Sequence, residues 1–296
     1  MSALTPTLPG QKIRVGKNFA AWLGVLPFFV FSLLFLVLPT FLLLIGAFQD
    51  SAGNLSFQSI ANLARPDIVK SFVLSTEISA TSAIGGAIFG FILAYCAVSG
   101  GLPQWIRPTL MTFSGVASNF AGVPLAFAFI ATLGRTGLVT AALVKFFDFN
   151  IYSAGFNLLN FWGLTLTYLY FQIPLMILIL TPAIDGLKKE WREASTILGC
   201  SNFQHWRYVI FPILWPSVVG ATLLLFANSF GAVATAYALT NSTLNIVPIL
   251  LFAQIRGDVL HDPNLGYALA LGMVAITGLS NLAYIFLRAR GERWIK

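Results

Sequence analysis

Six long runs of apolar residues, almost free of charge, constrain this chain more than any other feature of its sequence. Such runs are typical of membrane-spanning helices, because a helix rises 1.5 Å per residue and about 20 apolar residues cross about 30 Å of hydrocarbon. The first run is too long for a secretory signal peptide, and no small-residue cleavage site follows it. We therefore expect an all-α polytopic membrane protein with six transmembrane helices. The predicted spans cover residues 23–48, 71–98, 108–133, 158–184, 213–239 and 266–287.

The composition excludes an ordinary soluble domain. Hydrophobic residues make up 57% of the 296 residues and charged residues only 9%, with a mean hydropathy of +0.83. Soluble domains carry about 25% charged residues, so this chain has too little charge to cover a soluble surface. The net charge of +7 suggests a nucleic-acid partner at first sight, but the positions of the charges explain it differently.

Six spans place both termini on one side of the membrane, and the basic residues indicate which side. Twelve of the 17 Lys and Arg residues lie in the terminal segments, at Arg107 or in the loop between the fourth and fifth spans. Cytoplasmic loops carry an excess of Lys and Arg, so we expect both termini and that loop in the cytoplasm. Membrane topology thus accounts for the net charge, and we expect no nucleic-acid partner. The chain divides into a cytoplasmic tail (1–18), a transmembrane domain (19–288) and a second cytoplasmic tail (289–296).

The loop between the fourth and fifth spans, residues 185–212, is the most distinctive polar stretch, and we call it the elbow. Its first half has apolar residues at helical spacing, which predicts an amphipathic helix. Gly199 stands where a helix C-terminus favours a residue that tolerates positive φ. The residues expected on the apolar face of the first helix are Leu187, Trp191, Ala194 and Leu198.

The second half of the elbow predicts another short helix. Ser201 and Gln204 have the spacing of a capping box, which starts a helix. Pro212 suits the first turn of the span that follows, where its missing N–H costs nothing. An alternative interpretation is a solvated connector, with Trp191 and Trp206 resting on lipid headgroups.

The elbow resembles a known family motif. Glu193-Ala194-Ser195, then three residues, Gly199, then nine residues and the sequence Val-Ile-Phe-Pro ending at Pro212, is similar to the "EAA" loop of permease subunits of type I ATP-binding-cassette importers. The usual pattern is Glu-Ala-Ala, a Gly four residues on, and Ile-x-Leu-Pro after nine more. This chain departs at Ser195, Val209 and Phe211, each time conserving size or apolarity. The resemblance covers about residues 70–288.

The resemblance implies a bacterial inner-membrane subunit with several partners. These are a pair of cytoplasmic ATPases, a second permease, for which we expect a paralogue, and a periplasmic substrate-binding protein. The chain has no Gly-x4-Gly-Lys-Ser/Thr loop, so ATP and magnesium are expected on the partner ATPase and no cofactor in this chain. We also expect no catalytic residues and no metal site. The residues assigned to ATPase coupling are Trp191, Glu193, Ala194, Ser195, Gly199 and Pro212.

Polar residues within spans are costly and usually face the bundle interior, so they are candidates for the substrate path. We select Glu77, Asn119, Asn228 and Ser229. Each could instead make an interhelical hydrogen bond that only supports packing, and we favour that reading for Ser118 and Gln172. Glu77 could also be hydrated, or pair with Lys70 or Arg65.

The substrate class follows only weakly from the sequence. Residues 228–239 resemble the fifth span of permeases of polyamine, ferric-iron, thiamine and aminoethylphosphonate importers, although Ser229 stands where those relatives often have Glu. A single intramembrane carboxylate, Glu77, favours a cationic substrate such as a polyamine.

The main alternative is an ion-coupled secondary transporter of a small solute. That class would need several intramembrane carboxylates, or broken helices at matching places in two repeats. One carboxylate and no visible repeat argue against it. Residues 138–149 further predict an interfacial helix, and the glycines at 85, 86 and 90 predict close helix contacts.

Overall fold

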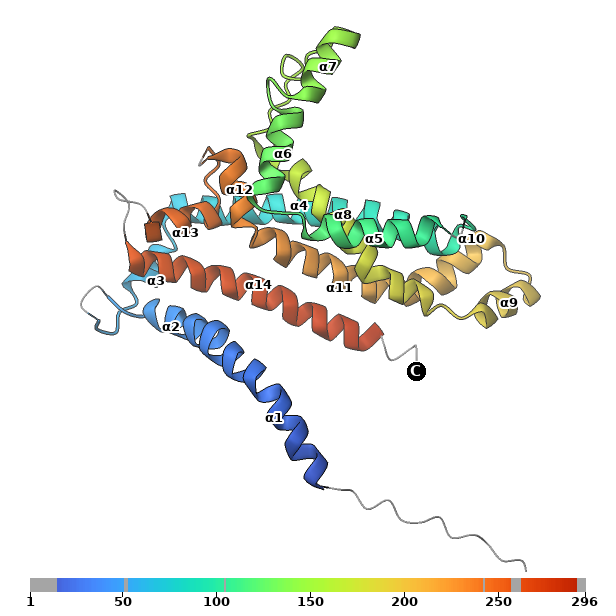
Figure 1. The fold of residues 1–296 in the computed structure, drawn as a ribbon, viewed down its shortest axis with the longest axis horizontal. Helices are drawn as coiled ribbons and strands as arrows, with labels where there is room; N and C mark the ends of the chain where they lie inside the picture. Colours follow the sequence, from blue (N-terminus) through green and yellow to red (C-terminus); the bar gives the residue numbers. More distant parts are fainter. Residues whose placement is uncertain (1–14, 51–52, 104, 242, 257–261, 292–296) are drawn as a thin grey trace, which may run out of the picture.

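The computed structural model describes residues 15–50, 53–103, 105–241, 243–256 and 262–291 (Figure 1). Within these ranges the regular elements are helices, apart from one isolated bridge between Gln49 and Leu55. The first eight elements are α1 (Val15–Ser32), the π-helix η1 (Leu33–Val37), α2 (Leu38–Gly46), α3 (Gln58–Asn62), α4 (Pro66–Ser99), α5 (Ile106–Asn119), α6 (Val123–Leu133) and α7 (Leu138–Phe147). The others are α8 (Phe161–Asp185), α9 (Lys189–Ile197), α10 (Asn202–His205), the π-helix η2 (Trp206–Ile210), α11 (Phe211–Phe230), α12 (Val233–Thr240), α13 (Val247–Arg256) and α14 (Pro263–Gly291).

Four long helices, α4, α8, α11 and α14, run along a common axis and form the bundle (Figure 1). Their contacts depend on small residues. A Cβ atom added at Gly90 would lie 2.5 Å from Met176 Cβ, and one at Gly86 would lie 2.8 Å from Gln172 Cβ. The predicted close helix contacts are therefore confirmed, because only glycine lets α4 and α8 approach this closely.

Six segments of the described chain are long and apolar enough to cross a membrane, which confirms the predicted fold class. Four agree with the predicted spans, although most begin or end several residues away from the expected positions, and the fifth is displaced to residues 202–230. The third differs more, since it joins α6 and α7 over residues 123–147. The six segments are 24–46, 66–99, 123–147, 161–185, 202–230 and 263–289.

The prediction of a continuous third helix over residues 108–133 is wrong. The chain leaves the helix after Asn119 and resumes at Val123, with Gly122 at a φ of +77°. The backbone N–H of Gly122 donates to Thr235 Oγ1 at 2.7 Å, so a side chain replaces the helical acceptor. A tertiary hydrogen bond thus stabilises a break in an otherwise apolar run.

The prediction of a continuous fifth helix over residues 213–239 is also wrong. It begins at Asn202, because α10, η2 and α11 follow one another without a gap. It ends at Phe230, and α12 starts after the turn at Gly231 and Ala232. The two breaks lie together, since Thr235 on α12 accepts the Gly122 hydrogen bond.

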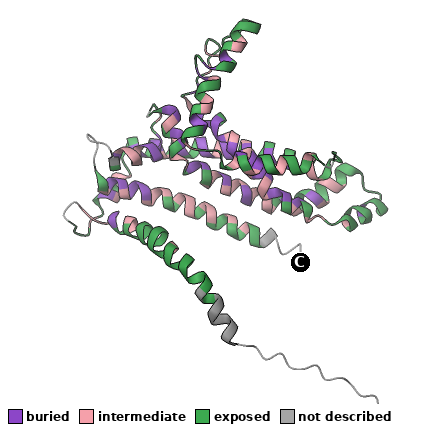
Figure 2. Cartoon of the chain, viewed as in Figure 1, coloured by how far each residue is buried: buried purple, intermediate pink, exposed green. Residues whose placement is uncertain are grey.

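Two segments leave the bundle. The α6–α7 arm projects away from the axis of the bundle, and α7 confirms a helix at residues 138–147 (Figure 1). The first span also diverges, and Figure 2 shows it exposed along most of its length. Its contact with the bundle is at the α2 end, where Gly46 lies against the ring of Tyr267.

The free ends of α1 and α14 point to the same end of the molecule as the elbow (Figure 1). This agrees with an even number of spans. Of the predicted tails, 1–18 and 289–296, residues 1–14 and 292–296 lie outside the described residues, whereas residues 15–18 and 289–291 belong to α1 and α14. Both cysteines are free and exposed in this chain.

Candidate functional site

The turn at the centre of the elbow is a Schellman motif. Gly199 has a φ of +76°, the backbone N–H of Gly199 donates to Thr196 O at 3.0 Å, and that of Cys200 donates to Ser195 O at 2.9 Å. This pattern ends α9 and satisfies its last carbonyls. A Cβ at position 199 would meet no atom within 4 Å, so the backbone conformation alone requires glycine there.

The second arm of the elbow starts as the sequence predicts. Ser201 Oγ accepts from Gln204 N at 3.3 Å, and Gln204 Oε1 accepts from Ser201 N at 2.8 Å. The capping box is therefore confirmed. The arm does not end as a short helix, however, because it runs directly into η2 and α11.

Pro212 accordingly lies within a continuous helix and not at the start of a separate span. The helix widens before the proline, where the N–H of Phe211 donates to Trp206 O, an i to i−5 bond. A π-turn accommodates the missing N–H of a proline without ending the helix. The elbow is thus fused rigidly to α11.

Ser195 and His205 connect the two arms across the turn. Ser195 is buried and its Oγ donates to Arg192 O at 2.8 Å, while 2.9 Å separates the same Oγ from His205 Nδ1. Because the serine proton is used on Arg192, the imidazole N–H is the donor in the second bond. This bond is specific to a serine, whereas the usual family pattern has alanine at this position.

The prediction of which residues form the apolar face of α9 is only partly confirmed. Leu187 and Trp191 are half-buried against the bundle, but Ala194 is exposed and Leu198 is 81% exposed. The helix ends at Ile197, so Leu198 follows the turn outward. Glu193 is exposed as well. The outermost apolar side chains, which we call the tip, are Ile197, Leu198 and Phe203.

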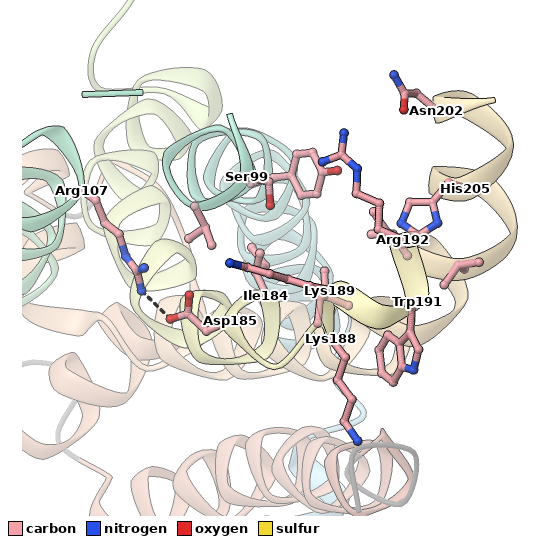
Figure 3. A pocket seen from close by; sticks show the side chains of 15 residues that line it. Ser99, Arg107, Ile184, Asp185, Lys188, Lys189, Trp191, Arg192, Asn202 and His205 are labelled. Carbon is pink, nitrogen blue, oxygen red and sulfur yellow. Dashed lines mark hydrogen bonds and ion pairs between the residues drawn. The ribbon is translucent and has the colours of Figure 1, made fainter. Parts of the chain in front are cut away.

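A cavity of about 480 Å³ lies between the elbow and the ends of α4, α5 and α8 (Figure 3). Arg107 and Asp185 form an ion pair at its edge and connect the start of α5 to the end of α8. No sequence pattern indicates this pair, because 78 residues separate its members.

The substrate-path candidates separate into exposed and buried groups. Asn119 and Asn228 are exposed beside the two helix breaks, and Asn119 Nδ2 donates to Gly115 O at 2.9 Å. Two residues that make hydrogen bonds at the helix breaks were not identified from the sequence. Thr235 accepts from the Gly122 N–H, and the Tyr168 hydroxyl donates to Ala232 O at 3.1 Å.

The buried candidates support packing. Gln172 is fully buried and its Nε2 donates to Ser82 Oγ at 2.8 Å, while its Oε1 has no hydrogen-bond partner among the residues that the structure describes. Ser229 Oγ lies within hydrogen-bonding distance of the carbonyls of Leu225 and Phe226 on its own helix and of Ser79 O on α4, at 3.4 Å. Ser118 is half-buried, and its Oγ donates within its own helix.

Glu77 lies on the outer side of α4, opposite the buried face of that helix. It is exposed and borders a groove of about 350 Å³ with Thr76 and four apolar residues. Arg65, one of its suggested partners, pairs instead with Asp67 at 3.2 Å.

Comparison with known proteins gives one matching family model. Residues 86–296 match the model described as binding-protein-dependent transport system inner membrane component. The chain is 25% identical over 288 residues to the spermidine/putrescine transport system permease protein PotB of Haemophilus influenzae, covering 94% of this chain and 93% of that protein. It is 26% identical over 216 residues to a probable sulfate transport system permease protein cysT of a Helicosporidium species, covering 69% and 72%.

A putative ferric transport system permease protein FbpB 1 of Haemophilus influenzae is 23% identical over 303 residues, but the chain spans only 46% of its length. Among solved structures, a bacterial ABC transporter involved in alginate import matches with a TM-score of 0.70 at 14% identity, covering 95% of this chain and 98% of that one. Broken helices are also found in ion-coupled secondary transporters. The family match nevertheless favours the importer permease over that class. The chain belongs to the binding-protein-dependent inner-membrane components and is a permease subunit of an ATP-binding-cassette importer.

Proposed function

We propose that the elbow is the docking surface of a cytoplasmic ATPase, which binds ATP and magnesium and moves the helix bundle when it closes. The observation that carries this proposal is the tip, where Ile197 is 86% exposed and Leu198 is 81% exposed at the polar end of the molecule. Exposed apolar groups with polar neighbours mark protein interaction sites. The positive-inside distribution supports a cytoplasmic location for this end.

The local geometry of the elbow supports its use as a lever. The Schellman turn, the capping box and the Ser195–His205 hydrogen bond hold α9 and α10 in one fixed arrangement. The continuous helix from Asn202 to Phe230 then carries any displacement into the bundle. Movement of such a rigid element against a packed bundle changes the conformation by discrete steps.

We propose that a second permease, a paralogue of this chain, packs against it in the membrane. The first span has a mean hydropathy of 2.8 and none of its most hydrophobic window is buried. The α6–α7 arm projects away from the bundle (Figure 1), and Phe127 and Phe146 on it are exposed as well. Both surfaces are suited to a partner as apolar as lipid.

For the substrate we propose a small solute, in the first place a polyamine, delivered by a periplasmic binding protein. Glu77 is the single carboxylate within the predicted spans, and it is exposed. The relative PotB, named for spermidine and putrescine, matches over 93% of its length. We place the path beside Glu77 and the helix breaks near Asn119 and Asn228.

Co-purification with a candidate ATP-binding-cassette ATPase tests the docking surface. Leu198→Glu places a charge in the tip and is expected to abolish co-purification. Leu102→Glu adds the same charge at the same end of the bundle but outside the elbow, and is expected to leave co-purification intact. Equal recovery of the ATPase with both variants would reject the elbow as the docking surface.

The substrate is tested separately in proteoliposomes that contain the complete complex. Spermidine, sulfate and ferric iron are each supplied with a binding protein that binds them. The proposal expects spermidine uptake, reduced at least tenfold by Glu77→Gln. Uptake of sulfate or iron alone, with Glu77→Gln fully active, contradicts the polyamine assignment and leaves the docking surface standing.

A further inference from the structure

None of the three tip residues lines the cavity behind the elbow, so an ATPase docked at the tip leaves this cavity unexplained. Its walls come from the ends of α4, α5 and α8 and from the inner side of α9, α10 and η2. A volume of about 480 Å³ is in the usual range of small-ligand sites. It is therefore large enough for a headgroup-sized ligand.

The lining of this cavity is strongly basic. Arg107 and Asp185 form an ion pair and cancel each other's charge. Three further cations, Lys188, Lys189 and Arg192, line the same cavity without a second carboxylate among the lining residues. Tyr95, Ser99 and Asn202 add neutral hydrogen-bond donors. Such a set of cations and donors is suited to phosphate oxygens.

The directions of the basic side chains distinguish them. In Figure 3, Lys189 extends toward the Arg107–Asp185 pair, and Arg192 extends toward Ser99 at the end of α4. Lys188 points away from both, and its Nζ lies 6.0 Å from the centroid of the Trp191 ring. Lys189 and Arg192 are thus the two cations of α9 that extend toward the ends of the bundle helices on the far side of the cavity, whereas Lys188 does not.

We propose that this cavity binds a phosphate-bearing anion, held by Lys189 and Arg192 between α9 and the ends of α4 and α5. Basic pockets between transmembrane helices on the cytoplasmic side suit anionic lipid headgroups. Trp105 and Trp215 are exposed near this end of the bundle, as aromatic residues are at the depth of the headgroups. An anionic phospholipid is therefore the nearest source of the phosphate, and free phosphate shares its chemistry.

Binding is measured by native mass spectrometry on the full chain, titrated with dihexanoyl phosphatidylglycerol or dihexanoyl phosphatidylcholine. The probes share their acyl chains and differ in charge. We expect phosphatidylglycerol to bind at least tenfold more tightly than phosphatidylcholine. Lys189→Gln with Arg192→Gln is expected to lower the phosphatidylglycerol affinity at least tenfold. Arg207→Gln removes the same charge from η2, outside the cavity, and is expected to change the affinity less than twofold.

Inorganic phosphate distinguishes the two sources. Displacement of phosphatidylglycerol by phosphate, or binding of phosphate alone that is lost in the double variant, supports the site and shows that it accepts the free anion. Binding of phosphatidylglycerol that resists millimolar phosphate supports the lipid as the source. Equal affinity for both lipids together with no binding of phosphate overturns the proposal, as does phosphatidylglycerol or phosphate binding that the double variant leaves unchanged. Lys189 and Arg192 are exposed, so we expect the double variant to fold. Each single variant removes one of the two charges, and each is also expected to lower the affinity for phosphatidylglycerol.

Discussion

Ser195 and His205 lie on opposite sides of the Gly199 turn, and only 2.9 Å separates Ser195 Oγ from His205 Nδ1. The serine hydroxyl donates to Arg192 O at 2.8 Å, so the imidazole N–H completes the connection between the arms. The two arms of the elbow therefore share one hydrogen-bonded network, which fixes the angle between α9 and α10.

Ser195→Ala, which restores the usual family residue, is expected to loosen the elbow. Removal of the Ser195–His205 hydrogen bond is expected to lower the free energy of unfolding by about 0.5–1.5 kcal/mol. His205→Ala removes the same bond, so the double variant should cost less than the sum of the two single variants. Thermal unfolding of the three variants in detergent measures this coupling. Additive losses would show that the two side chains act independently.

Gly90→Ala is expected to separate α4 from α8. The new methyl group would lie 2.5 Å from Met176 Cβ and 2.9 Å from the backbone oxygen of Ile173. Overpacking of this kind typically costs about 1–3 kcal/mol. Gly115→Ala is the matched control, since a Cβ there meets no atom within 4 Å. Thermal unfolding should show a lower midpoint for Gly90→Ala only, and equal midpoints would contradict the close contact.

Thr235→Val is expected to weaken the connection between the two helix breaks. The change keeps the shape of the side chain but removes the acceptor of the half-buried Gly122 N–H, so the cost is expected at the lower end of the about 1–3 kcal/mol of a buried donor left without a partner. Thr132→Val is the control, because its hydroxyl donates only to carbonyls of its own helix. Hydrogen exchange of residues 120–124 should quicken in Thr235→Val and stay unchanged in Thr132→Val. Unaltered exchange in both variants would show that Thr235 does not stabilise the break at Gly122.

The sequence was sufficient for the number of spans and for the turn and the capping box of the elbow, because these depend on local chemistry. Hydrophobic runs identify spans by length alone, and the turn at Gly199 and the capping box at Ser201 each involve residues only a few positions apart. The breaks at Gly122 and Gly231 could not be predicted in the same way. Their flanking residues are as apolar as the spans, and the stabilising bond joins residues 113 positions apart.

The same distinction applies to the candidate site. The cavity behind the elbow and the Arg107–Asp185 ion pair exist only once α5, α8 and α9 meet. The helical spacing predicted Leu198 on the apolar face of α9. This prediction failed because the helix ends one residue before Leu198. Pro212 was expected to start a helix, but the π-turn before it lets the helix continue.

The central claim, that an ATPase drives the bundle through the elbow, is tested most directly by the ratio of substrate transported to ATP hydrolysed in proteoliposomes. Gly199→Val forces a β-branched residue into a left-handed conformation, at a cost of about 1–2 kcal/mol, although the site has space for it. Gly199→Asn is the control, because asparagine tolerates this conformation. We predict that Gly199→Val lowers the ratio at least tenfold while hydrolysis continues, and that Gly199→Asn keeps it near the wild-type value. An unchanged ratio in Gly199→Val would contradict the account.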